Sequence, residues 1–168
     1  MSGIDQHQAP SKLTEAQTDQ YLTFMLNGEE YGVDILRVQE IKGWDSVTPL
    51  PNTPSYVRGV INLRGTIVPI IDLRERFHMQ TVDYGPTTVI IVLKVISCDS
   101  EGQVRERITG VVVDSVSDVR NIPQGEIQPP PPVGGGNNQG IRGLSHVDEH
   151  LLILLDIDQL LGLDAGGF

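Results

Sequence analysis

The architecture of this 168-residue chain can be deduced from one stretch, RGVINLRGTIVPIIDL at residues 58–73. β-branched residues dominate both of its flanks and suit a pleated surface, which predicts two strands joined by a tight turn. Gly65 stands where a short hairpin often needs a positive φ, so we expect Arg64 at the tip of the turn. Residues 67–71 contain no polar side chain, which predicts a strand buried on both faces.

Asp72 ends this predicted hairpin and begins a short helix. Its carboxylate can accept hydrogen bonds from the first helical amides, and Glu75 three residues later completes a capping box. Asp156 and Gln159 repeat this spacing near the end of the chain, after the apolar run at residues 151–155. We therefore expect a second short helix after Asp156, which Gly162 can end.

Similar residues recur along the chain at two constant offsets, 78 and then 84. The pairs separated by 78 residues include Gly32 with Gly110, Val38 with Val116, and Pro51 with Pro129. The pairs separated by 84 residues include Arg58 with Arg142, Ile70 with Leu154, and Asp72 with Asp156. The extra residues fall in a loop rich in proline and glycine at residues 129–140, where insertions are well tolerated. The sequence therefore contains an internal repeat.

This repeat predicts an all-β protein of two similar lobes, each with about five short strands and most naturally a small barrel. The expected lobes span residues 19–85 and 86–162 of a single domain at 19–168, with exchange of strands between them left open. Residues 1–18 are polar and are expected to form a mobile tail. Residues 97–107 are expected to be a polar connection. Two packed lobes leave a groove between them, where ligands or partners often bind.

Charge and composition exclude several classes of function. The net charge of −10 would repel the phosphates of nucleic acids and of anionic membranes. Cys98 is the single cysteine, so no internal disulfide can form, and this fits a reducing compartment. Residues 1–12 lack the apolar segment of a signal peptide, and no apolar run reaches the length of a membrane span. We expect a cytoplasmic protein with no direct membrane insertion.

Each motif that could support catalysis is weak. Ser145 lies in a sequence that is one glycine short of a nucleophile elbow and precedes a strand instead of a helix. His146 and His150 have the spacing of a metal pair on a helix, but the intervening residues 148–149 predict a turn between strands. The glycines at 134–136 have no lysine after them to bind phosphate. We therefore predict no enzymatic activity, no metal and no cofactor.

Arginines are concentrated around the central hairpin of this acidic chain. Four of the twelve basic residues, namely Arg58, Arg64, Arg74 and Arg76, lie within nineteen positions. For Arg74 and Arg76 we expect solvated side chains. Arg64 differs because a rigid, exposed tip would present a planar guanidinium that can bind carboxylates. These features favour a protein-binding module, and the alternative from a different class is a two-barrel enzyme or small-ligand binder that uses the interlobe groove.

The chain resembles the CheW family of bacterial chemotaxis coupling proteins over about residues 20–162. The resemblance rests on four segments, at residues 30–41, 58–65, 67–74 and 110–119. It implies two SH3-like five-stranded barrels on a shared hydrophobic core, without catalysis. It also implies an adaptor that couples transmembrane chemoreceptors to the histidine kinase CheA at membrane-associated receptor arrays. Sister interpretations are the CheW-like part of a CheV or a CheA-type protein.

The resemblance also implies which residues contact the partners. The receptor-binding positions would be Val38, Glu40, Gly59, Arg64 and Val119. We expect Val38 and Val119, taken as equivalent positions of the two lobes, to form the walls of the groove. The regulatory domain of CheA would bind at the ends of the barrels, for which no short motif identifies residues. The segments 97–107 and 129–140 depart from the family pattern and could alter such contacts.

Overall fold

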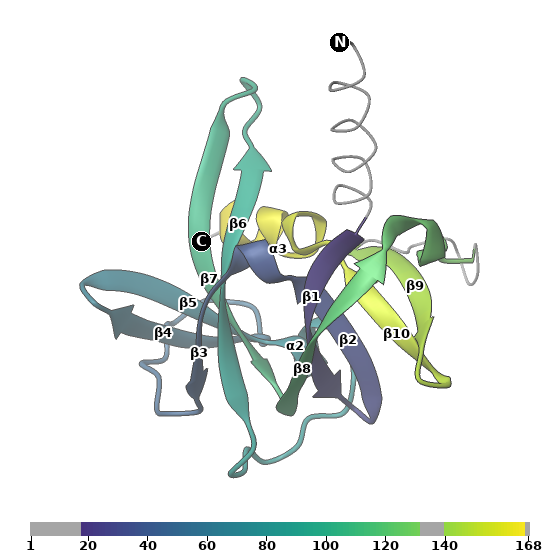
Figure 1. The fold of residues 1–168 in the computed structure, drawn as a ribbon. Coiled ribbons are helices and arrows are strands. Elements are labelled where there is room, and N and C mark those ends of the chain that lie inside the picture. Colours follow the sequence, from purple (N-terminus) through teal and green to yellow (C-terminus); the bar gives the residue numbers. More distant parts are fainter. Residues whose placement is uncertain (1–17, 132–139, 167–168) are drawn as a thin grey trace.

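The computed structural model describes residues 18–131 and 140–166, in which ten strands form two five-stranded sheets (Figure 1). We call the sheet with the order β3-β6-β7-β5-β4 the first barrel and the sheet with the order β8-β1-β2-β10-β9 the second barrel. The first contains β3 (Val38–Gly43), β4 (Val57–Leu63), β5 (Thr66–Asp72), β6 (Val89–Cys98) and β7 (Val104–Val113). The second contains β1 (Thr18–Leu26), β2 (Glu29–Asp34), β8 (Ser115–Pro123), β9 (Ile141–Val147) and β10 (His150–Leu155).

Short helices connect or follow these strands. They are η1 (Ile35–Arg37), α2 (Leu73–Arg76), η2 (Gln124–Glu126) and α3 (Ile157–Gly166). Asp72 caps α2 as predicted, because its carboxylate accepts hydrogen bonds from the amides of Arg74 and Glu75. Glu75 does not complete the predicted capping box, since the amide of Asp72 donates to the carbonyl oxygen of Tyr56 instead. Asp156 likewise accepts a hydrogen bond from the amide of Gln159. The prediction that Gly162 ends the last helix is wrong, since α3 continues through it to Gly166.

The all-β fold of two barrels related by an internal repeat is confirmed. In the first barrel Ile70 of β5 pairs in parallel with Gly110 of β7, and in the second Leu154 of β10 pairs in parallel with Gly32 of β2. A Cβ atom at Gly110 would lie 2.7 Å from Ile70, and one at Gly32 would lie 3.0 Å from Leu154. Each glycine therefore makes room for the aliphatic side chain on the neighbouring strand.

The barrels exchange strands. β1 and β2 join β8, β9 and β10, whereas β6 and β7 join β3, β4 and β5. The boundary expected between residues 85 and 86 therefore does not separate the two sheets, and neither barrel is a continuous half of the chain. Short-range patterns define a hairpin such as β1–β2, but they do not define which sheet the hairpin joins.

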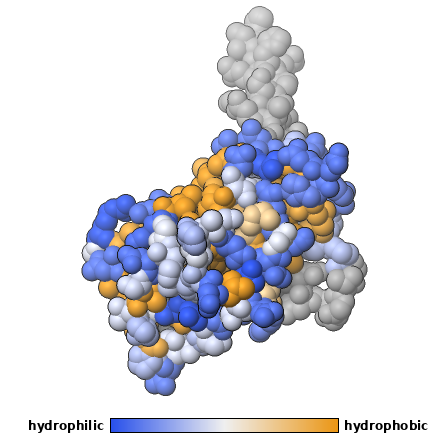
Figure 2. Space-filling model, turned by 90° about the horizontal axis from the view of Figure 1, so that it is seen from below, coloured by the Kyte–Doolittle hydropathy of each residue, from blue (hydrophilic) through white to orange (hydrophobic). Residues whose placement is uncertain are grey.

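One hydrophobic core is shared by both barrels. Its largest cluster combines Phe24 of β1 and Leu155 of β10 with Ile91 of β6 and Ile71 of β5, all at most 3% exposed. Smaller clusters lie in each barrel, around Ile90 in the first and Leu152 in the second. On the outer face seen in Figure 2, apolar side chains lie in separate areas between polar ones.

One local expectation is wrong, a second is right only in part, and a third lies mostly outside the described residues. Residues 97–107 are largely paired, because the β6–β7 ladder continues to Cys98 and Val104 and leaves a connection of only five residues. This extended hairpin projects from the barrel (Figure 1). The strand at 67–71 is buried on both faces only toward its end, where Ile70 and Ile71 are 0% exposed, whereas Ile67 at its start is 60% exposed. The tail expected at residues 1–18 lies outside the described residues except for Thr18, which begins β1.

Candidate functional site

The turn between β4 and β5 presents Arg64 as predicted. Leu63 pairs with Thr66, so the connection is the two-residue turn Arg64-Gly65, and both residues have positive φ values, 51° and 89°. The side chain of Asn62 fixes the turn by accepting a hydrogen bond from the amide of Gly65 at 2.8 Å. The Arg64 side chain is 76% exposed. A rigid backbone therefore holds an exposed guanidinium.

Arg64 and Glu40 form an ion pair. Nη2 of Arg64 lies 2.6 Å from Oε1 of Glu40 on β3, which brings two of the predicted receptor-binding residues together. Both side chains border a hollow of about 220 Å³ at the mouth of the first barrel, beside Leu63 and Ile108. Because the contact uses one nitrogen of the guanidinium fork, the other donors stay available for a partner's carboxylate.

Val38 and Val119 do not occupy equivalent positions. The offset of 78 pairs Val38 with Val116 and pairs Val119 with Ile41. Val38 packs against the shared core, whereas Val119 on β8 is 45% exposed. Ile41, the true counterpart of Val119, is 42% exposed on β3.

One edge strand of each sheet, β3 in the first barrel and β8 in the second, thus carries one exposed β-branched side chain. Sequence analysis missed Ile41, although the repeat contained the signal. It also missed Leu36, which is 80% exposed in η1. The groove that we expected between the lobes stays a prediction.

Gly59 has a conformational role in this structure. Its φ is 146°, and a Cβ atom there would lie 2.3 Å from the carbonyl oxygen of Thr48. Thr48 pairs with Val60 through two backbone hydrogen bonds of 2.9 Å, which bring the segment after β3 back onto β4. In the second barrel, Gly143 makes the same close approach possible beside Gln128. Gly59 therefore shapes the site without offering a side chain to a partner.

The expectation that Arg74 and Arg76 are solvated is wrong. Arg74 is 12% exposed and forms two hydrogen bonds with the Asp114 carboxylate, at 2.9 and 2.7 Å. Arg76 donates to the carbonyl oxygen of Leu160 in α3 at 3.1 Å and lies over the ring of Tyr56. Both arginines are therefore structural.

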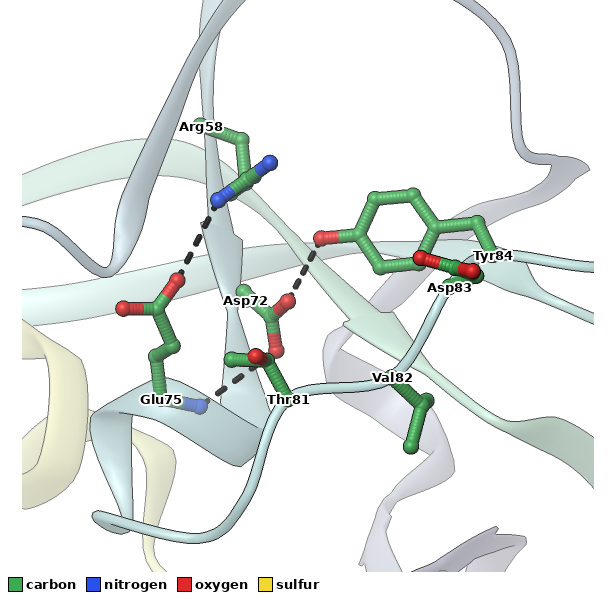
Figure 3. Close-up of a pocket in the computed structure, with 7 residues that line it drawn as sticks. All are labelled: Arg58, Asp72, Glu75, Thr81, Val82, Asp83 and Tyr84. Carbon is green, nitrogen blue, oxygen red and sulfur yellow. Dashed lines mark hydrogen bonds and ion pairs between the residues drawn. The ribbon is translucent and has the colours of Figure 1, made fainter.

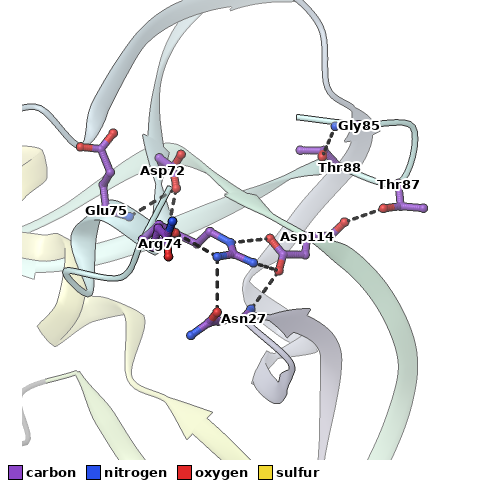
Figure 4. Close-up of polar contacts among 9 residues, drawn as sticks. Asn27, Asp72, Arg74, Glu75, Gly85, Thr87, Thr88 and Asp114 are labelled. Carbon is purple, nitrogen blue, oxygen red and sulfur yellow. Dashed lines mark hydrogen bonds and ion pairs between the residues drawn. The ribbon is translucent and has the colours of Figure 1, made fainter. Parts of the chain in front are cut away.

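Asp114 connects the two barrels, because it lies between β7 of the first and β8 of the second (Figure 4). Besides Arg74, it accepts a hydrogen bond from the amide of Asn27, in the β1–β2 turn, at 2.9 Å. Arg74 lowers the pKa of Asp114 most, and the Asn27 amide acts in the same direction against the effect of burial. A second bidentate pair joins η1 to α3, where both terminal nitrogens of Arg37 donate to the Asp158 carboxylate at 2.7 Å.

A polar hollow of about 600 Å³ lies beside α2 (Figure 3). Its floor is the nearly buried Asp72, which accepts a hydrogen bond from the Tyr84 hydroxyl at 2.5 Å and caps the helix. Burial, followed by the hydrogen bond to Asp72, raises the pKa of Tyr84. Arg58 lies over the Tyr84 ring and pairs with Glu75. The described contacts of Asp72 thus fix α2 and the segment at 81–84.

An apolar hollow of about 450 Å³ lies at the end of the first barrel where β5 and β7 separate. Their parallel pairing covers residues 70–72 of β5, so the strand up to Pro69 pairs with β4 alone among the described strands. Ile67 and Leu50 border this hollow. Exposed aliphatic side chains beside an unpaired strand edge are typical of protein contacts.

Within the described residues, no group of three or more His, Cys, Asp or Glu side chains is arranged to bind a metal ion. None of the helices among the described residues is both long and apolar enough to cross a membrane.

Comparison with known proteins identifies the family. The model of the CheW-like domain matches residues 20–165. The chain belongs to the CheW-like family. A chemotaxis protein CheW of Klebsiella aerogenes is 47% identical over 153 residues, covering 90% of this chain and 87% of that protein. A probable chemotaxis protein CheW of Rhizobium etli is 36% identical over 140 residues, covering 83% of this chain and 84% of that protein.

A solved CheW structure shares the two-barrel fold. The crystal structure of the scaffolding protein TtCheW from Thermoanaerobacter tengcongensis superposes with a TM-score of 0.73 at 33% identity, covering 85% of this chain and 92% of that one. The matched relatives are named as chemotaxis proteins and TtCheW as a scaffolding protein, and together they support a chemotaxis adaptor role for this chain. The resemblance inferred from the hairpin and repeat motifs is therefore confirmed.

Proposed function

We propose that the chain couples transmembrane chemoreceptors to the histidine kinase CheA in the cytoplasm, at membrane-associated receptor arrays, and catalyses no reaction. The observation that carries the receptor part is the Arg64–Glu40 pair, held by a rigid turn and exposed on one side. Relatives named CheW, which are 47% and 36% identical to this chain, favour the coupling protein over the CheV-type and CheA-type alternatives. Isothermal titration of the full chain with a receptor-tip fragment and with the kinase regulatory domain tests the proposal directly.

The receptor surface would combine a charged rim with apolar contacts. The receptor tip is a helical hairpin, whose carboxylates could bind the open side of the Arg64 fork. Ile41 and Val119 offer exposed aliphatic surface on one edge strand of each barrel, and Val38 lies on the same strand as Glu40. Gly59 would act indirectly, through the backbone approach at Thr48.

Arg64→Ala is expected to weaken receptor binding by about 1–3 kcal/mol, as for an arginine hot spot. The unfolding free energy should change by less than about 1 kcal/mol, because the ion pair with Glu40 is exposed. Arg64→Lys should restore part of the receptor affinity, since lysine lacks the planar fork. Titrations with both partners and a melting curve for each variant measure these effects. Equal loss of both affinities with a large fall in Tm would show that Arg64 is structural.

The kinase surface would be the apolar end of the first barrel. Ile67 is exposed beside a strand edge that pairs on one side only, and the hollow next to it could accept an apolar side chain from another barrel. This placement rests on the barrel-end contact that the family resemblance implies.

Ile67→Asp is expected to lower the affinity for the kinase regulatory domain at least about tenfold, because a charge would be desolvated at an apolar contact. Receptor affinity should change much less. Val82→Asp is the matched control, since Val82 is an exposed aliphatic residue beside the polar hollow near α2. If Ile67→Asp left kinase affinity as unchanged as Val82→Asp does, the first-barrel end would not be the kinase surface.

A further inference from the structure

A buried carboxylate closes one end of the second barrel. Glu30 on β2 is 5% exposed, and its two oxygens contact Nε2 of His150 on β10 and Nε of Arg120 on β8, the latter at 3.3 Å. Arg120 also donates from Nη1 to the carboxylate of Asp148, in the β9–β10 turn, at 2.9 Å. We call Glu30, Arg120, Asp148 and His150 the latch. It joins three strands and a turn of the second barrel.

The first barrel has different residues at the corresponding positions. By the repeat offsets, Thr66 stands where His150 stands, and Ile108 stands where Glu30 stands. Both Thr66 and Ile108 border the hollow at the mouth of the first barrel. The polar latch of one barrel thus corresponds to an open, partly apolar mouth in the other.

The two barrels also differ in where their parallel strand pairing begins. In the second barrel, β10 pairs with β2 from Leu152 and Glu30 onward. In the first barrel, the equivalent ladder begins two residues later, at Ile70 and Gly110. The latch therefore lies at the level where β10 and β2 are still paired in the second barrel but the corresponding β5 and β7 are separated in the first barrel. This comparison indicates that the latch holds the β9–β10 hairpin onto β2.

A protonated ring satisfies both contacts of His150. Nε2 faces the Glu30 carboxylate, and Nδ1 lies 3.3 Å from the carbonyl oxygen of Asp148. Both partners are acceptors, and a neutral imidazole has one N–H, so it can donate to only one of them. An imidazolium donates to both. The side chain is 43% exposed, so its proton can exchange with solvent.

We propose that the latch is a pH-responsive device, in which protonated His150 holds the β9–β10 hairpin against β2 and its deprotonation loosens that hairpin. The charged groups that face the ring are Glu30 from β2 and Arg120 from β8, and Asp148 contributes its carbonyl oxygen while its carboxylate pairs with Arg120. Glu30 raises the pKa of His150 most, through the direct hydrogen bond, and outweighs burial and the charge of Arg120.

The direction of the pH effect follows from this shift. Because the folded-state pKa lies above the ordinary value of 6.5, the latch stabilises the fold fully below that value. The stabilisation is lost as the pH rises through the pKa of the folded state. Val119 precedes Arg120 on β8, so a loosened latch would also affect the proposed receptor surface, a consequence that rests on the proposed function. The latch itself does not depend on any partner.

Nuclear magnetic resonance titration of the free full-length protein tests the charge state. His150 should titrate above 6.5, and Glu30→Gln should lower its pKa by removing the carboxylate. A His150 pKa at or below 6.5 in the unmodified protein would overturn the proposal. Because Glu30→Gln removes a buried acceptor and can impair folding, Arg120→Gln is the second variant, and it should raise the pKa of His150 further.

Urea unfolding at about pH 6 and about pH 9 tests the coupling of His150 to stability. His150→Gln should lower the urea midpoint at the lower pH and have a much smaller effect at the higher one. His146→Gln is the matched control, because His146 is an exposed histidine on the same hairpin, and it gives the baseline for removing a histidine from that hairpin. If the effect of His150→Gln were equal at both pH values, or matched that of His146→Gln, the proposal would be wrong.

Amide hydrogen exchange locates the loosened segment. The ratio of the amide exchange rate in β9–β10 to the rate in the equivalent β4–β5 hairpin cancels the intrinsic pH dependence of amide exchange. The ratio should rise between about pH 6 and about pH 9 in the unmodified protein and stay constant in His150→Gln. A constant ratio in both proteins would overturn the assignment of the device to this hairpin.

Discussion

Gly59→Ala should destabilise the protein by about 3 kcal/mol or more, from backbone strain combined with overpacking. The φ of 146° at this position is one that residues with a Cβ atom rarely adopt, and the added Cβ would lie 2.3 Å from the carbonyl oxygen of Thr48. Relief of that overlap would break the two hydrogen bonds between Thr48 and Val60. Chemical denaturation of the purified variant measures the loss.

Two other glycines separate strain from overlap. At Gly65 the φ is 89°, but the space around an added Cβ atom is open. Gly65→Ala should therefore lower the unfolding free energy by only about 1 kcal/mol. At Gly43 the space is open and the φ is not positive, so Gly43→Ala should leave the unfolding free energy nearly unchanged. Receptor binding by Gly59→Ala should fall in proportion to the unfolded or rearranged fraction. A fully stable Gly59→Ala protein with selectively reduced receptor affinity would instead show that position 59 contacts the receptor.

Asp114→Ala is expected to cost about 2–3 kcal/mol of unfolding free energy, between the values for exposed and buried ion pairs. The substitution removes both carboxylate contacts of Arg74, which is largely buried, and leaves the amide of Asn27 without this acceptor. Equilibrium unfolding in urea at neutral pH measures the effect. Glu106→Ala is the control, since Glu106 is an exposed carboxylate on β7.

The pH dependence of the Asp114 effect has a defined sign. Arg74 is the largest influence that depresses the pKa of Asp114 below its ordinary value of 3.8. A carboxylate with a depressed folded-state pKa contributes its stabilisation above the unfolded-state pKa and loses it as the pH falls through the folded-state pKa. The difference between the unmodified protein and Asp114→Ala should therefore be constant near neutrality and shrink in acid below 3.8. A difference that grew in acid would contradict this account.

Local chemistry was the part of the fold that could be predicted from the sequence. Gly65 identified the turn that exposes Arg64, and Asp72 identified a helix start, because both effects depend on residues within a few positions. The two offsets identified the duplication before any contact was known. Each of these signals lies within one element or in a comparison of two elements.

Long-range contacts were the part that could not be predicted. Arg74 looked like a surface arginine because its partner, Asp114, lies 40 residues further along the chain. The Arg64–Glu40 pair was likewise hidden, since hairpin geometry alone does not say which strand the tip approaches. The exposure of Ile67 depends on where β7 stops pairing with β5. Receptor and kinase contact residues stay predictions.

The exchange of hairpins between the barrels has a consequence for folding and assembly. A fragment containing only β1–β5 would hold a hairpin with no barrel to join and a barrel with a missing hairpin, and a fragment containing only β6–β10 would have the same defect. Two copies of one repeat could satisfy each other by trading hairpins. The fold thus has the topology of a domain-swapped dimer whose two subunits are fused end to end. Cutting the chain between Arg76 and Val89 should therefore give two pieces that complement each other when mixed.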